Sequence, residues 1–252
     1  MKLLNIDANP KTVKGQKKGY MTAILYLAPY KLSGYQVCPM AEQAGCIGDC
    51  LNTAGRGGMA PLNADTLEVD GHVVRLNSVQ RARIQRTRLL FEDRETFMCT
   101  LACEIIAAQK KAAKKGLELV VRLNGTSDIR WENIKFGPLA ATIFEHFPDI
   151  QFYDYTKIAN RRISHISNYH LTFSFSAVKK FQANFKKAME FYGRAMNFAV
   201  VFKGNIPKTF MGMDVVNGDE TDLRFLDSQG VIVALKAKGK ARKSDSGFAV
   251  AA

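Results

Sequence analysis

The stretch LELVVRLNG at residues 117–125 decides the fold class, because it is a short apolar run that stops at an asparagine and a glycine. A run of this length, rich in leucine and valine, is typical of a strand buried on both faces of a parallel sheet. Comparable runs recur along the chain. Six further strands are predicted, at residues 20–30, 150–157, 170–176, 197–204, 213–220 and 230–239.

Helical periodicity fills several of the intervals between these strands. The pattern over 78–115 predicts two helices that separate at EDRE, 92–95, and a Gly/Pro-punctuated loop over 55–73 precedes them. The second helix carries apolar residues at three- and four-residue steps, and Gly116 follows it as a helix-ending residue. Shorter helices are predicted at 136–148, 158–166 and 177–195. Strands that alternate with helices indicate βαβ units and a parallel sheet.

The parallel sheet can be arranged in two ways. An open doubly wound sheet and a closed or partial (β/α) barrel both suit about six to seven strands, and of the two we expect the partial or closed parallel barrel. No G-x-G-x-x-G follows the first strand, so the usual dinucleotide-binding fingerprint is missing. We expect one α/β domain over residues 1–252, with a basic N-terminal arm (1–19) and a basic C-terminal tail (237–252).

The chain is strongly basic, with 36 Lys and Arg against 23 Asp and Glu and a formal net charge of +13. Such a surplus favours a polyanionic partner, and the alternative is a solvated basic face. No run of eighteen apolar residues and no signal-peptide pattern is present, so we expect a cytoplasmic protein with no membrane association. The residues predicted to contact nucleic acid or a nucleotide are Arg81, Arg83, Arg86, Arg88, Lys238 and Lys240.

Three of the five cysteines fall in CPMAEQAGCIGDC, residues 38–50, with the spacing C-x7-C-x3-C. A reducing cytosol and an odd number of cysteines argue against disulfides and favour metal or redox chemistry. Zinc would need a fourth ligand, from Cys99, Cys103 or one of the four histidines, and no histidine shows a metal-binding spacing. We expect Cys99 and Cys103 to be buried in the core. Three thiolates after the first strand also fit a [4Fe–4S] cluster with one open iron.

Polar side chains follow the predicted strands at the point where each strand ends. Ligands of parallel α/β folds bind beyond the carboxyl ends of the strands. We therefore expect a cofactor or substrate site there, although turn residues are polar in any case. Its predicted members are Asn124, Thr126, Asp128, Asp154, Lys157, Ser174 and Ser176.

The cysteine loop and the β/α rhythm resemble the radical S-adenosylmethionine superfamily, whose members carry three cysteines after the first strand of a six-unit partial barrel. That resemblance implies a [4Fe–4S] cluster on Cys38, Cys46 and Cys50, with S-adenosylmethionine as a further cofactor. The usual superfamily spacing is C-x3-C-x2-C, from which this loop departs.

A second resemblance extends over nearly the whole chain. The stretches GYMTAILYLAPYKLSGYQVCP, CLNTAGRG, RARIQRTRLLFEDRETFM, VRLNGTSDIRWE, YDYTK and GVIVALKAKGKA are similar to the bacteriophage gene product 88 family. The resemblance implies a phage or prophage origin and action in the cytosol of a bacterial host. It brings no reaction with it.

Two functional hypotheses follow from these observations. The first is a phage-encoded iron–sulfur enzyme of radical S-adenosylmethionine-like architecture that acts on an anionic substrate, either a nucleotide or nucleic acid. The alternative is a non-enzymatic phage protein that binds nucleic acid or a host factor, with cysteines that bind zinc or simply pack. Metal identity separates the two kinds of site, and the salt dependence of binding reports on the partner.

Overall fold

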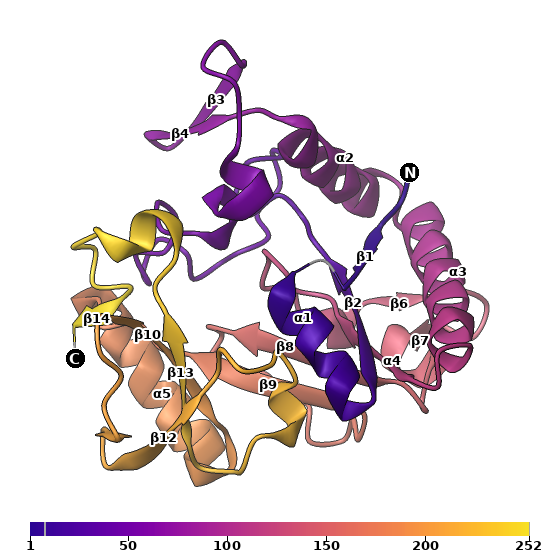
Figure 1. Cartoon of the computed structure of the whole chain (residues 1–252). Helices are drawn as coiled ribbons and strands as arrows, with labels where there is room; N and C mark the ends of the chain where they lie inside the picture. Colours follow the sequence, from indigo (N-terminus) through magenta and orange to yellow (C-terminus); the bar gives the residue numbers. More distant parts are fainter. Residues whose placement is uncertain (8, 252) are drawn as a thin grey trace.

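Seven parallel strands form the centre of the molecule in the computed structural model, which describes residues 1–7 and 9–251 (Figure 1). Their order across the sheet is β2-β5-β8-β9-β10-β13-β12, so neighbours in sequence are neighbours in space except at the last pair. All seven predicted strands are confirmed. Their bounds are β2 Tyr20–Leu25, β5 Glu118–Arg122, β8 Gln151–Thr156, β9 Tyr169–Ser174, β10 Phe198–Lys203, β12 Met213–Asn217 and β13 Ile232–Lys236.

Short strands at both edges keep this sheet open. Strand β1 (Leu4–Ile6) pairs antiparallel with β2, and β11 (Thr209–Phe210) pairs antiparallel with β12. A tenth strand, β14 (Val250–Ala251), pairs parallel with β10. The expected parallel sheet is confirmed, but a barrel of six to seven strands is not formed. The outer edges of β2 and β12, which closure would have to join, are hydrogen-bonded to β1 and β11 instead.

One face of the sheet is covered by helices and contains most of the core. Helix α3 (Arg94–Ala113) packs against β5, β1 and β2, and α5 (Gln182–Tyr192) contributes Phe185 to an aromatic cluster with Phe173 and Phe198. Helix α4 (Ile143–His146) adds Phe144 beside Phe152. These contacts satisfy the rule that an amphipathic helix must bury its apolar stripe against another element.

The opposite face of the sheet is covered by loops and short helices. Helix α1 (Pro10–Gly15) lies against β2, and Leu223, next to the single-turn η7 (Arg224–Leu226), packs with Val120 and Tyr153. Asp222 pairs with Arg122 at 3.1 Å and accepts a hydrogen bond from Tyr153. The segment between β12 and β13 therefore caps this face with a small apolar cluster and a buried ion pair.

The two helices predicted over 78–115 are confirmed as α2 (Ser78–Glu92) and α3. Asn77 caps α2, Asp93 caps α3 through Thr96 N, and the break falls at the predicted EDRE. No helix among residues 1–7 and 9–251 is long and apolar enough to cross a membrane. The shorter one-turn helices are η1 Gln16–Lys18, η2 Leu51–Thr53, η3 Gly55–Gly58, η4 Trp131–Asn133, η5 Lys179–Phe181, η6 Gly193–Ala195 and η8 Gly239–Arg242.

Of two further predicted helices, the one at 136–148 is confirmed only over α4, and the one at 158–166 is wrong. Over 136–148 only α4 is helical, because the ribbon of β6 (Lys135–Phe136) and β7 (Ala141–Thr142) comes first and Thr142 starts the helix late through a capping box. The segment 158–166 is irregular. There the buried Arg161 binds Glu132, and its backbone N–H donates to the Tyr192 hydroxyl.

The regions expected to be irregular contain regular structure. The arm 1–19 holds β1, α1 and η1, and the tail 237–252 holds η8 and β14. The loop 55–73 contains most of a hairpin of β3 (Thr66–Val69) and β4 (His72–Arg75), which forms a separate two-stranded sheet. These elements are short and gain their stability from pairing with distant parts of the chain, which local sequence does not report.

The apolar stripe of α3 is confirmed, whereas the expected burial of Cys99 and Cys103 is wrong. Both cysteines are exposed, because they lie on the helix face that points away from the sheet. Cys99 makes a long contact from its thiol to Glu95 Oε1 at 3.7 Å, one turn earlier. The buried stripe consists of the predicted Phe97, Leu101, Ile105, Ala108 and Ala112, together with Met98.

This division of α3 predicts opposite effects for two neighbouring substitutions. Leu101→Ala should lower the free energy of unfolding by about 2–5 kcal/mol, because Leu101 is fully buried in the core. Cys103→Ala should change it by less than about 0.5 kcal/mol, because that side chain is exposed. Urea denaturation of both variants checks the assignment, and a large loss in Cys103→Ala would contradict it.

Candidate metal centre

The cysteine loop follows β2 at the carboxyl edge of the parallel strands and is built from consecutive tight turns. Ala41 N–H donates to Cys38 O, Gly45 N–H to Glu42 O, and Cys46 N–H to Ala41 O. Gly45 has a φ of +63°, and a Cβ there would lie 2.9 Å from a methyl group of Val178. Both the left-handed backbone and the close approach require glycine at this position.

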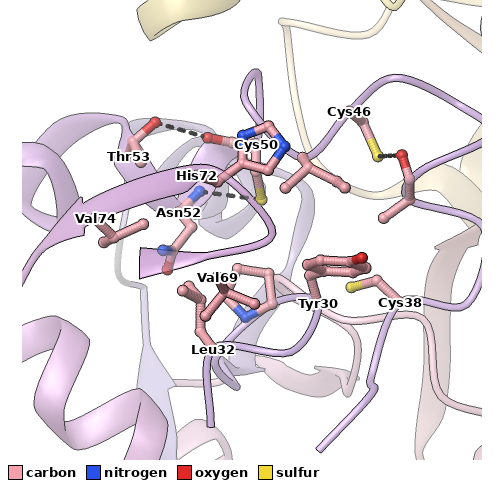
Figure 2. A pocket seen from close by; sticks show the side chains of 13 residues that line it. Tyr30, Leu32, Cys38, Cys46, Cys50, Asn52, Thr53, Val69, His72 and Val74 are labelled. Atoms are coloured by element: carbon pink, nitrogen blue, oxygen red, sulfur yellow. Dashed lines mark hydrogen bonds between the residues drawn. The ribbon is translucent and has the colours of Figure 1, made fainter. Parts of the chain in front are cut away.

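Cys38, Cys46 and Cys50 line one cavity of about 50 Å³ (Figure 2). Figure 2 shows their sulfur atoms placed around the hollow, with Tyr30 and His72 also at its wall. Most of the remaining wall is apolar. It consists of Pro29, Leu32, Ala41, Ile47, Val69 and Val74, with Asn52 and Thr53 beside them.

All three thiols are free, and each has one weak polar contact. The Cys38 thiol donates to Thr126 O at 3.7 Å, the Cys46 thiol donates to Ala41 O at 3.7 Å, and Asn52 N–H donates to Cys50 Sγ at 3.4 Å. Burial raises the pKa of Cys38 and of Cys46, and it raises the pKa of Cys50 to about 11. The thiols are therefore protonated at neutral pH, and a metal that binds them must displace protons.

His72 is a member of this cavity that the sequence did not reveal. It comes from β4 in the separate hairpin, more than twenty residues after Cys50. A Cβ placed on Gly48 would lie 3.9 Å from His72 Nδ1, so the imidazole faces the backbone between Cys46 and Cys50. The local sequence does not indicate that His72 lines the cavity. Its strand pairs with β3 in the hairpin, and only the tertiary fold brings it next to the cysteine loop.

The donor set of three thiols and one imidazole suits zinc or an iron–sulfur centre. Within residues 1–7 and 9–251, however, no three His, Cys, Asp or Glu side chains are grouped closely enough to hold an ion. A metal would therefore have to draw the cysteine loop and the hairpin inward. The chemistry of the wall fits a metal, and its present spacing is wider than a coordination sphere.

Asn124 and Asp154, predicted to hold a cofactor, form a buried hydrogen-bonded junction instead of facing open space. Asn124 N–H donates to Asp154 Oδ1 at 2.7 Å, and Asn124 Nδ2 donates to Asp154 Oδ2 at 3.3 Å. Asn124 Oδ1 accepts from Ser127 Oγ, Ile129 N and Trp131 Nε1. Burial raises the pKa of Asp154 to about 7. Both side chains shape the loop that follows β5.

Thr126 and Asp128 connect that loop to the cysteine segment and to β8. Thr126 Oγ1 donates to Leu27 O at 2.5 Å, while its carbonyl accepts the Cys38 thiol. Asp128 accepts hydrogen bonds from Thr156 Oγ1 and Lys157 N, and Arg161 lies 3.5 Å away. Burial raises the pKa of Asp128, an effect that the Arg161 charge opposes.

The last three predicted residues, Lys157, Ser174 and Ser176, lie near the cysteine loop. Lys157 Nζ donates to Ser174 O at 2.9 Å, to Ser174 Oγ at 3.0 Å and to Phe175 O at 3.3 Å. Burial lowers the pKa of Lys157, and the negative charges of Cys46, when it is ionised, and of Asp128 oppose that shift. Ser176 Oγ donates to Ala44 O, two residues before Cys46. The predicted polar residues thus gather at one sheet edge and support the cysteine loop, and their role as ligands stays a prediction.

The four arginines of α2 make contacts within the chain. Arg83 is buried and donates from Nη1 to Asn52 O and Oδ1, which fixes the backbone just after Cys50. Arg86 donates to Lys2 O and Tyr26 O, Arg88 donates to Ser33 O, and Arg81 pairs with Asp65. Arg83 therefore has a structural role, and a direct contact of Arg83 with nucleic acid would require it to leave the interior.

A second hollow, of about 550 Å³, opens where η8 meets the cysteine loop, and its wall is rich in basic side chains. Lys240 belongs to its wall, whereas Lys238 lies 3.5 Å from Asp219 in an exposed ion pair. Asp49 reaches the wall from between Cys46 and Cys50 and accepts a hydrogen bond from Ser246 Oγ. The wall, termed here the basic groove, consists of Asp49, Gly239, Lys240, Arg242, Lys243 and Ser244.

Comparisons with known proteins identify the chain's relatives at the level of a family. No curated protein matches the chain, and no solved structure matches it. The comparisons give no support to the resemblance to the radical S-adenosylmethionine superfamily. The family model described as gene product 88 matches residues 2–252, which is nearly the whole sequence. The chain therefore belongs to the phage gene product 88 family.

Proposed function

We propose that this phage-family protein binds a [4Fe–4S] cluster through Cys38, Cys46 and Cys50 and acts as an iron–sulfur enzyme on an anionic substrate. The single observation that carries the proposal is that three thiols of one short loop line one cavity at the carboxyl edge of a parallel sheet. This edge is where parallel α/β proteins place their ligands. The apolar wall suits a soft, sulfur-rich centre that is shielded from water.

The position of the other two cysteines favours a centre with three thiolate ligands. Cys99 and Cys103 are exposed on α3 and are not part of the cavity wall, so a Cys₄ zinc site would need them to leave their helix. When bound, a [4Fe–4S] cluster supplies one-electron chemistry and, at an iron without a thiolate, a place for substrate or S-adenosylmethionine. The chain's own part is to bind the irons, exclude water and orient the substrate.

The metal site is tested on protein purified without oxygen and reconstituted with iron and sulfide. We expect a brown protein with roughly four iron and four sulfide ions per chain, as the cluster composition requires. Cys46→Ala should lose most of both. The matched control, Cys99→Ala, removes an exposed thiol and should keep them. A colourless protein that contains zinc, or no metal at all, would overturn the iron–sulfur assignment.

The basic groove is the observation that favours an anionic substrate. Lys240, Arg242 and Lys243 are exposed and form no ion pair within the described part of the chain, and Asp49 is the one acid of the wall. Its size lies in the range of ligand-binding hollows. Because Asp49 stands between Cys46 and Cys50, a phosphate group bound in the groove would lie next to the cysteine loop. Charge and position together favour a nucleotide or nucleic acid.

Fluorescence anisotropy with labelled single-stranded DNA, duplex DNA and RNA tests the groove over a range of salt concentrations. Lys240→Glu/Lys243→Glu should weaken binding at least about tenfold and reduce the slope of log Kd against log salt by about two. Lys110→Glu/Lys111→Glu on α3 makes the same change in net charge away from the groove. Equal losses in both double variants would mean that net charge alone acts. Competition by a mononucleotide separates the two substrate classes.

A further inference from the structure

The hairpin of β3 and β4 covers the cysteine cavity without belonging to the main sheet. Its strands pair only with each other, and Figure 1 shows the hairpin projecting beyond the end of α2. The turn Asp70–Gly71 has φ values of 49° and 77°, which suit a tight two-residue connection. One side of the hairpin supplies Val69, His72 and Val74 to the cavity wall (Figure 2).

A polar cluster formed by the buried Tyr30 and the more exposed Lys31, Glu42 and Asp70 joins the tip of this hairpin to the cysteine loop. Asp70 lies 2.8 Å from Lys31 Nζ and accepts a hydrogen bond from the Tyr30 hydroxyl at 2.5 Å. The same hydroxyl also lies within hydrogen-bond distance of Glu42 Oε1, inside the cysteine segment, so the two carboxylates share one donor. The Lys31 and Asp70 side chains are 42% and 51% exposed, so their ion pair contributes little stability. The Lys31–Asp70 ion pair by itself therefore holds the hairpin over the cavity only weakly.

His72 differs from the other histidines in its surroundings. His146 lies 3.5 Å from Phe136 O, and His170 is on β9 in the main sheet. The His72 imidazole has no hydrogen bond to any residue among 1–7 and 9–251, and it faces the loop between Cys46 and Cys50. An imidazole that lines a cavity with three thiols and has no other partner is available as a ligand.

We infer that His72 is the fourth protein ligand of the centre held by Cys38, Cys46 and Cys50, so that the complete set is Cys₃His. This inference rests on the proposed metal site, but it does not depend on which metal occupies the site. Three thiolates with one imidazole form a known closed set for zinc, and histidine also replaces cysteine in some iron–sulfur centres.

The sequence origin of the ligands gives the inference a structural consequence. The three cysteines come from residues 38–50, whereas His72 comes from β4. A bound metal would therefore link the hairpin covalently to the cysteine loop, which the weak Lys31–Asp70 pair does not do. Metal binding would close the hairpin over the cavity, and substrate could reach the metal only when His72 leaves it.

The experiment uses Co²⁺ as the probe, titrated into reduced, metal-free full-length protein and followed by optical absorption. Since losing even an outer-sphere partner costs about 10–100-fold in metal affinity, His72→Ala should weaken Co²⁺ binding at least about tenfold. His72→Cys should restore it, because it supplies a fourth thiolate. His165→Ala, which alters an exposed histidine outside the cavity, should match the parent protein.

Limited trypsin digestion adds a readout that is independent of affinity. Arg75 is exposed at the end of β4, and Co²⁺ should protect it from cleavage in the parent protein and in His72→Cys but not in His72→Ala. If Cys46→Ala abolishes Co²⁺ binding while His72→Ala leaves both binding and protection unchanged, only the role of His72 fails. If Cys46→Ala binds Co²⁺ like the parent, the proposed metal site fails as well.

Discussion

The buried pair of Asn124 and Asp154 is the junction on which the carboxyl edge of the sheet depends. Asp154 is fully buried on β8 and accepts hydrogen bonds from Asn124 N, Asn124 Nδ2 and the Tyr169 hydroxyl. The pair joins the loop after β5 to β8 and β9 at one point. From that loop Thr126 reaches back to Leu27, just beyond β2. A buried polar network of this kind specifies one arrangement, because each unsatisfied member would cost about 1–3 kcal/mol.

The sequence predicted what short-range chemistry controls. All seven parallel strands and the stripe of α3 follow from apolar periodicity, and the break between α2 and α3 follows from an acidic capping residue, Asp93. The open form of the sheet could not be predicted, because it depends on β1 and β11 occupying the edges, and strands of two or three residues leave almost no pattern. Arg161 shows the same limit, since it is buried against Glu132 in an irregular segment where the local sequence pattern predicts a helix.

The candidate site was predictable to the same degree. The cysteines were found because all three lie in one loop, and the polar strand ends were found because parallel strands share one carboxyl edge. His72 escaped notice because only the tertiary fold brings its hairpin over the cavity. Arg83 was predicted to contact nucleic acid, but it donates to the carbonyl of Asn52. A basic helix face has the same sequence pattern whether it contacts a phosphate or a backbone carbonyl.

Two very different environments meet on the cysteine loop, and their separation is consistent with the proposed enzymatic role. On one side the three half-buried cysteines present protonated thiols to a mostly apolar cavity wall, which suits the proposed soft metal centre. On the other side lies the open groove with Lys240, Arg242 and Lys243, which favours phosphate. Asp49 stands at the boundary, held by Ser246. An anion in the groove would remain hydrated and paired with cations while its neighbouring atoms approached a dry centre. A reaction that needs both charge recognition and a shielded redox group requires that arrangement.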